Sequence, residues 1–260
     1  MTQTKVTTKG APKKETPKFK FPTETIDLPS KGLVYPEENP LSSGKVEMKY
    51  MTAKEEDIIT NQNYIQKGVV IDKLLQSLII SEMNYPDLVI GDKNALLVAA
   101  RVLGYGKDYK FTYLGEDFEV DLSTLENKEI DESQFTPGVN DFEYLLPTTE
   151  VNVTFQLMTE GLDKKIEAEL KGLAKFKKEV SPEMSTRMKH LITSVDGDRD
   201  RKSIREFVDN YLLARDAKAL RDYIAKFQPD VDFKFERENR RGEIVEADIP
   251  ITSNFFFPND

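Results

Sequence analysis

KDYKFTYLGEDFEVDL, residues 107–122, alternates apolar and polar side chains on both sides of one glycine, Gly115. The apolar members are Tyr109, Phe111 and Tyr113 before the glycine, and Phe118, Val120 and Leu122 after it. Because successive side chains of a strand point to opposite faces, this period of two predicts strands with one buried face. Two such runs joined at a glycine predict an antiparallel β-hairpin.

The sequence before this hairpin predicts a β segment followed by helices. Residues 24–51 alternate apolar and polar side chains around two clusters of turn residues, which favours short strands. Thr52 is followed three residues later by Glu55, the pattern of a capping box at the start of a helix. NALLVAARVL, residues 94–103, is almost entirely apolar, so we expect a helix in the middle of the core that ends at Gly104.

The sequence after the hairpin predicts a second strand pair, then helices, then a β ribbon. Residues 142–158 carry alternating apolar positions around a Pro-Thr-Thr turn. Residues 200–213, DRKSIREFVDNYLL, show the three- and four-residue spacing of an amphipathic helix. Residues 231–251 alternate again around a turn at Arg241-Gly242. The predicted fold class is α+β, with an N-terminal β segment and helices, central antiparallel hairpins, and a C-terminal helical bundle closed by a β ribbon.

Changes in composition divide the chain into four parts. Residues 1–22 are rich in Lys, Thr and Pro and poor in apolar side chains, so we expect a disordered basic arm. Residues 23–123 form an N-terminal α+β part, and the acidic, turn-rich residues 124–141 form a loop or linker. Residues 142–260 hold the strand pair, the helical bundle and the C-terminal ribbon.

Charge and composition argue against several classes of function. The chain has 260 residues and a net charge of −9; its first 22 residues carry six Lys against one Glu, so the remainder carries −14. That remainder is a poor surface for nucleic acid, whose binding depends on Lys and Arg. Without cysteine and with one histidine, His190, disulfides, thiol nucleophiles and multi-histidine metal sites are impossible. We expect no metal and no cofactor, and the absence of any run of about 20 apolar residues argues against a membrane span.

No group of residues has the pattern of a catalytic site. The three aspartates of residues 196–200 alternate as in a calcium loop, but an EF-hand needs its glycine and its bidentate glutamate at other positions. We interpret this segment as a turn in which Gly197 has a positive φ and an aspartate caps the next helix. His190 lies late in a helix for which Ser181 is the predicted cap and Pro182 the first residue, and it is interpreted as structural. We therefore predict no catalytic residue and no enzyme; a hydrolase using carboxylates such as Glu55 or Glu160 stays open as an alternative.

The last ten residues, ITSNFFFPND, contain three consecutive phenylalanines. On a strand, Phe255 and Phe257 would point to one side and Phe256 to the other. One face of the strand could then enter the chain's own core, where burial of a Phe side chain stabilises the fold by about 1.5–3 kcal/mol. The opposite face would stay exposed and could bind a partner. The alternative is that all three lie in the core. Pro258 would end the strand because proline has no N–H to donate.

Four segments carry a family resemblance: TETIDLPSKGLVYPEENPLSSGKVEMKYMTAKEEDI (23–58), SVDGDRDRKSIREFVDNYLLARDAKALRDYI (194–224), QPDVDFKF (228–235) and ADIPITSNFFFP (247–258). In this order they resemble the baseplate hub family of T4-like contractile-tailed bacteriophages. The resemblance covers nearly everything from about residue 23 to the end. Some members carry paired cysteines near the C-terminal ribbon, and their absence here argues against a metal role.

The resemblance implies a structural component of a phage tail baseplate hub that acts by protein–protein contacts in tail assembly. Its partners would be other hub and tail tube proteins, in a homo- or hetero-oligomer, with no membrane partner. Its place would be the virion tail, after assembly in the host cytoplasm. The alternatives are a transient assembly chaperone absent from the finished virion and, less favoured, nucleic-acid binding through the basic arm. The proposed partner-binding residues are Phe255, Phe256, Phe257 and Pro258 at the terminus, and Leu28, Pro29, Leu33 and Tyr35 in LPSKGLVYP.

Overall fold

The computed structural model describes residues 22–175, 182–238, 241–251 and 255–256. Within these parts the α-helices are α1 (Ala53–Ile59), α2 (Gln62–Gln66), α3 (Val70–Leu78), α4 (Ile90–Tyr105), α5 (Glu160–Ala174), α6 (Glu183–Leu191), α7 (Arg201–Asn210) and α8 (Ala214–Phe227). The 3-10 helices are η1 (Pro40–Ser43), η2 (Tyr85–Asp87), η3 (Leu122–Thr124) and η4 (Glu132–Gln134). The strands are β1 (Thr23–Asp27), β2 (Lys45–Lys49), β3 (Asp108–Tyr113), β4 (Glu116–Asp121), β5 (Phe142–Leu145), β6 (Asn152–Phe155), β7 (Ile192–Val195), β8 (Lys234–Glu238) and β9 (Ile244–Asp248).

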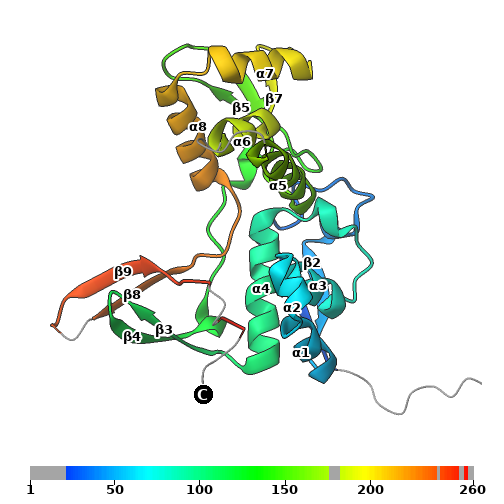
Figure 1. The fold of residues 1–260 in the computed structure, drawn as a ribbon, viewed down its shortest axis with the longest axis vertical. Coiled ribbons are helices and arrows are strands. Elements are labelled where there is room, and N and C mark those ends of the chain that lie inside the picture. Colours follow the sequence, from blue (N-terminus) through cyan, green and yellow to red (C-terminus); the bar gives the residue numbers. More distant parts are fainter. Residues whose placement is uncertain (1–21, 176–181, 239–240, 252–254, 257–260) are drawn as a thin grey trace, which may run out of the picture.

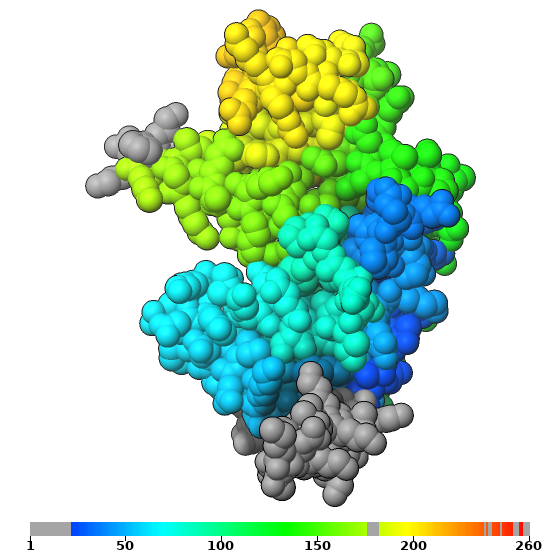
Figure 2. Space-filling model, turned by 90° about the vertical axis from the view of Figure 1, so that its right-hand side faces the viewer, coloured from blue at the N-terminus to red at the C-terminus, as the bar shows by residue number. Residues whose placement is uncertain are grey.

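The predicted α+β class is confirmed, because helices are combined with small antiparallel sheets. In the described chain β1 pairs with β2, β3 with β4 and β8 with β9, while β5, β6 and β7 form a three-stranded sheet. The molecule is elongated: β5–β7 and α5–α8 form one half, β1, β2 and α1–α4 form the other, and two ribbons project from the side (Figure 1). Figure 2 shows the two halves stacked along the long axis.

The hairpin predicted over residues 107–122 is confirmed as β3 and β4. Phe111 faces Phe118 across the strands, and Tyr109 faces Val120. These four side chains are at most 9% exposed, so they form the buried face that the alternation predicts. The predicted turn glycine, Gly115, has φ +82°.

The N-terminal half follows the sequence pattern closely. The β segment is the β1–β2 pair, and α1 begins after Thr52, whose backbone N–H donates to the Glu55 carboxylate as in a capping box. Helix α4 is central, as expected, but it does not end at Gly104. It continues to Tyr105, and Gly106 takes the positive φ of +85° at its end.

The C-terminal half contains a strand that the sequence pattern missed. The helix predicted around His190 is α6, which ends at Leu191, and the strand β7 follows it directly. Ile192, Thr193 and Val195 are β-branched, which favours extended backbone. Pairing with β6 then satisfies the backbone groups of this short segment. Ser181, predicted as a cap, lies outside the described residues.

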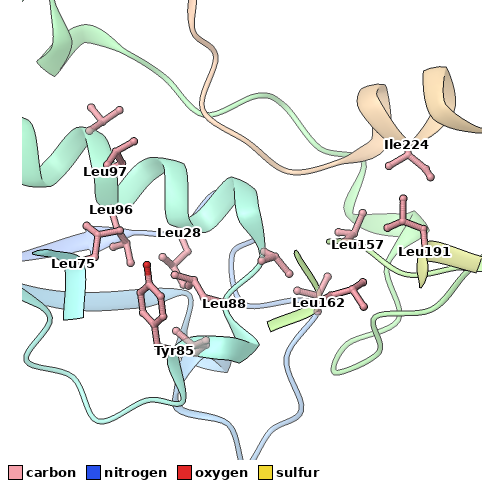
Figure 3. Packing of buried hydrophobic residues seen from close by; sticks show 14 of the residues in the cluster. Leu28, Leu75, Tyr85, Leu88, Leu96, Leu97, Leu157, Leu162, Leu191 and Ile224 are labelled. Atoms are coloured by element: carbon pink, nitrogen blue, oxygen red, sulfur yellow. The ribbon is translucent and has the colours of Figure 1, made fainter. Parts of the chain in front are cut away.

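Both halves share one hydrophobic core. Its buried members come from α3 and α4 in the first half and from β6, α5, α6 and α8 in the second. Figure 3 shows Leu162 of α5 between the group around Leu88 and the group of Leu157, Leu191 and Ile224. The loop or linker predicted between residues 124 and 141 therefore connects parts that pack together.

Close backbone approach fixes the contact between the halves. Gly91, in the first turn of α4, packs against the backbone of Pro229, so an added Cβ would lie 1.8 Å from its carbonyl oxygen. Asn94 of the same helix donates to the Asp230 carboxylate at 2.9 Å. On the other side, Gly161 at the start of α5 packs against Pro86. The segment leaving α8 is thus held against the start of α4.

The β8–β9 ribbon was expected to close the helical bundle, and the structure places it elsewhere. It lies beside the β3–β4 hairpin of the N-terminal part (Figure 1). Phe235 of β8 contacts Phe111 and Phe118, with ring centroids 5.1 and 5.4 Å apart. An isolated hairpin would leave its aromatic face exposed to water, and the β8–β9 ribbon packs against that face and buries it.

Candidate interaction site

The two ribbons together form a projecting arm, which we call the double-ribbon arm: β3–β4 with its turn, and β8 and β9. Both ribbons leave the body on the same side and end well away from it (Figure 1). A two-stranded ribbon alone is marginally stable in water. Here the aromatic contacts between Phe235 and the hairpin make each ribbon the cover of the other. The arm is therefore a structured projection.

The tips of this arm carry the most exposed large apolar side chains in the described chain. Leu114 is 82% exposed at the turn of the hairpin, and Ile244 is 77% exposed at the start of β9. Leu114 and Gly115 connect paired residues Tyr113 and Glu116 and both have positive φ, +50° and +82°. This is the conformation of a type I′ turn, in which Asn-Gly or Gly-Gly is preferred. A leucine in this backbone conformation lowers the stability of the fold by about 1–2 kcal/mol. Burial does not offset this cost, because the side chain is exposed.

The predicted docking segment LPSKGLVYP is largely internal. Leu28 and Tyr35 are 1% and 4% exposed, Pro29 is buried and Leu33 is partly buried. The segment is fixed by Asp92 of α4, whose carboxylate accepts from the Ser30 N–H at 2.8 Å, the Ser30 hydroxyl at 2.6 Å and the Tyr35 hydroxyl at 2.6 Å. Binding of a partner through Leu28 or Tyr35 would require them to leave the core.

The aromatic terminus is also internal as far as it is described. Phe255 and Phe256 are 0% and 3% exposed and form a short turn, so the expected strand with one free face is not found at these two residues. The Phe255 ring lies edge-on to Tyr109 of β3, with centroids 5.0 Å apart, and the Tyr109 hydroxyl donates to the Pro250 carbonyl at 2.7 Å. The chain end thus packs against the base of the arm. Phe257 and Pro258 lie outside the described residues.

Glu55, one of the two carboxylates considered for catalysis, has a structural environment. It is fully buried and accepts from Lys49 at 2.8 Å, the Thr52 hydroxyl at 2.6 Å and Ser77 at 2.7 Å. Burial opposes its ionisation, but the Lys49 ammonium and the hydroxyl donors outweigh burial and lower the pKa of Glu55 to about 2. An enclosed carboxylate that is ionised at neutral pH has no proton to donate as a general acid.

Replacing Glu55 with glutamine should therefore change the acid stability of the protein. The unfolded carboxyl titrates near 4.5 and the folded one near 2. Its contribution is present above the unfolded pKa and is lost as pH falls toward the folded pKa, and it amounts to about 3 kcal/mol at neutral pH. Urea unfolding of wild type and Glu55→Gln should differ by this amount at pH 7 and converge toward pH 2. The exposed neighbour variant Glu56→Gln should match wild type throughout; a gap for Glu55→Gln that is constant with pH would contradict the assignment.

Glu160, the second carboxylate considered, belongs to an ion-pair cluster between the halves. Lys93 lies 2.7 Å from Asp72 and 2.5 Å from Glu160, and Lys164 lies 2.9 Å from Asp72 and 3.5 Å from Glu160. Burial opposes ionisation of Asp72, but the two lysines lower its pKa below the usual range. Two carboxylates balanced by two ammonium groups join α3, α4 and α5, which is a structural arrangement.

The remaining candidate groups also have structural partners. Asp196 accepts from the Asn152 N–H, and Asp200 caps α7 by accepting from two of its backbone N–H groups. Gly197 has φ +84°, so the interpretation of this segment as a turn and helix cap is confirmed. His190 pairs with Glu169 at 2.8 Å. Among the residues with described positions, no three His, Asp or Glu side chains gather as a metal site would require.

Comparison with protein-family models, with curated proteins and with solved structures finds no match for this chain. No described helix combines the length and apolar character that crossing a bilayer requires. The resemblance to the baseplate hub family therefore stays a hypothesis. Sequence reasoning overlooked the exposed leucine at the arm tip, although a Leu-Gly pair at a turn where Asn-Gly is preferred is visible in the sequence.

Proposed function

We propose that this protein is a structural component of a contractile phage tail baseplate hub and acts by protein–protein contacts without catalysis. The function rests on the family resemblance of the four segments in the sequence. The architecture is compatible with it, because the double-ribbon arm projects from a body whose halves share one core (Figure 1). In this proposal the arm, and not the LPSKGLVYP segment or the buried Phe255 and Phe256, makes the contact with a neighbouring hub or tube protein.

One structural observation supports the assignment of the contact to the arm: the side chain of Leu114 is exposed, and its backbone conformation is unfavourable for leucine. It is 82% exposed and has φ +50°, a conformation that leucine rarely adopts. Strained, exposed apolar residues are found where a side chain is needed for binding. A leucine presented on a projecting turn is suited to insertion into an apolar pocket of a partner, where one buried anchor supplies much of the affinity.

Replacing Leu114 with asparagine is expected to stabilise the isolated protein and weaken its assembly. Asparagine suits the positive φ, so the free energy of unfolding should rise by about 1 kcal/mol. Loss of a buried anchor should lower incorporation into tails by about tenfold, which corresponds to roughly 1.4 kcal/mol. The measurements are urea unfolding, and quantitative mass spectrometry of tails purified from cells in which the variant replaces the wild-type chain.

The matched control is Leu145→Asn, which removes a leucine that is 61% exposed on β5, far from the arm. It should leave incorporation unchanged. If both variants are incorporated as well as wild type, the arm tip is not the contact. If the wild-type chain is needed for tail formation but is absent from finished tails, the protein acts as a transient assembly chaperone and the proposal of a retained subunit is wrong.

A further inference from the structure

A groove of about 670 Å³ runs along one face of α4, separate from the double-ribbon arm tip. Its floor includes Val98, Ala99, Val102 and Leu103 of α4, which recur at helical spacing. Ile26 of β1 lines it from one side, and η3 with the segment that follows lies along the other, beside α4. Val98 is buried, whereas Ala99, Val102 and Leu103 are half-buried, so part of the apolar surface of the central helix stays open to solvent in this groove.

The rim of this groove is acidic. Glu24, Asp27 and Glu126 line it, and no lysine or arginine is among its described lining residues. Asp27 pairs with Lys45 at 2.7 Å, whereas the carboxylates of Glu24 and Glu126 are exposed and make no ion pair with a described side chain. An apolar floor with a carboxylate rim fits a ligand that combines apolar rings with positive charges.

The sequence that precedes the described chain has this chemistry. PKFKFP, residues 17–22, alternates two phenylalanines with two lysines. In an extended segment Phe19 and Phe21 point to one side and the lysines to the other. The described chain begins at Pro22, whose carbonyl accepts from the N–H of Tyr50, and Tyr50 itself lines the groove. Phe19 is three residues from Pro22, a reach of about 10 Å.

We propose that the Phe19–Phe21 segment of the chain's own N-terminal arm occupies the α4 groove. The two rings cover the apolar stripe of α4, and the lysines of the segment pair with Glu24 and Glu126 at the rim. The tether favours the chain's own arm over any free ligand, because the short connection gives a high effective concentration.

The test uses the absence of tryptophan from the chain, so one introduced tryptophan is the only source of its fluorescence. Phe21→Trp in the full chain should emit at shorter wavelength and be quenched less by acrylamide than Thr7→Trp, the control in the same arm. Adding Glu24→Lys and Glu126→Lys to Phe21→Trp should shift the emission to that of Thr7→Trp. Adding Glu82→Lys and Glu206→Lys, an equal charge change at exposed sites away from the groove, should not.

A second measurement keeps the proposal testable if the rim variants misfold. A synthetic peptide of residues 1–21 carrying Phe21→Trp should show the same blue shift when titrated with the chain that lacks residues 1–21. Solvent-like emission of Phe21→Trp in the full chain would overturn the proposal. So would a peptide that does not bind at about 1 mM, the order of the effective concentration that a short tether provides. A blue shift that appears only with protein concentration, together with a dimer in light scattering, would assign the groove to the arm of a second copy and would equally overturn it.

Discussion

Phe255→Ala is expected to lower the free energy of unfolding by about 3–5 kcal/mol, the usual cost of removing a fully buried aromatic ring. The ring is 0% exposed, lies edge-on to Tyr109 at 5.0 Å and contacts Phe256 at 5.2 Å between ring centroids. Truncation of this ring leaves a cavity at the base of the double-ribbon arm. Equilibrium urea unfolding, followed by circular dichroism, measures the change.

The control for Phe255 is Tyr211→Ala, an aromatic truncation at a side chain that is 61% exposed. It should change stability by no more than about 0.5 kcal/mol, as is usual for surface sites. A chain ending at Ser253 should be destabilised at least as strongly as Phe255→Ala, because it lacks Phe256 as well. If Phe255→Ala is as stable as Tyr211→Ala but fails to assemble into tails, the phenylalanine is a docking residue and its burial in the chain's own core is not needed for folding.

Local pattern was enough to predict the elements whose structure is decided by neighbouring residues. The alternation on both sides of Gly115 predicted β3 and β4, and Thr52 with Glu55 predicted the start of α1. Both depend on contacts within a few residues, which periodicity and capping chemistry describe directly. The missed strand β7 has four residues, too short for a periodic signal, and its extended form depends on pairing with β6.

Placement of the apolar segments could not be predicted because it depends on contacts between residues far apart in the chain. The sequence of the terminal phenylalanines fits both a core role and a docking role. The contact that places Phe255 in the core is with Tyr109, which lies 146 residues earlier in the chain. The ribbon could cover the helices or the hairpin, since both offer apolar surface. At the candidate site, the leucine beside Gly115 was visible in the sequence. The packing of Phe235 on the hairpin, which combines the two ribbons into one arm, was not.

The LPSKGLVYP segment shows how one buried carboxylate can decide the location of a loop. Leu28, Pro29, Leu33 and Tyr35 are apolar residues among turn formers, a pattern that also fits an exposed docking loop. Asp92 stands in the first turn of α4, and its three hydrogen bonds to Ser30 and Tyr35 hold the loop against the helix. The Tyr35 hydroxyl in turn accepts from the Val89 N–H at 3.0 Å, just before α4. The loop therefore closes over the start of the helix.

Asp92→Ala should accordingly lower the free energy of unfolding by about 3–5 kcal/mol. The substitution leaves three buried donors without an acceptor, and each unsatisfied donor costs roughly 1–3 kcal/mol unless the surrounding structure rearranges. Asp57→Ala, at an exposed aspartate of α1, should cost less than about 0.5 kcal/mol in the same urea titration. Asp92→Asn keeps one acceptor oxygen and should lie between them.

The pH dependence separates the asparagine variant from wild type. Burial raises the pKa of Asp92 above its ordinary value despite the hydroxyl donors, so the folded state keeps this proton to higher pH than the unfolded state does. Wild type should therefore lose stability as pH rises from the unfolded pKa of Asp through the raised folded value, and Asp92→Asn should lack this loss.

A double-mutant cycle tests whether Asp92 and Tyr35 act as one unit. Tyr35→Phe alone removes a donor to Asp92 and the acceptor of the Val89 N–H, so it should destabilise the protein by about 1–3 kcal/mol. Added to Asp92→Ala, the same change removes a hydroxyl whose acceptor is already gone, so its cost should be smaller. Interaction energies of about 0.5–3 kcal/mol are typical of residues in one hydrogen-bonded network. Strict additivity of the two substitutions would mean that the Tyr35 hydroxyl and the Asp92 carboxylate contribute independently, and it would contradict the idea that they act as one unit.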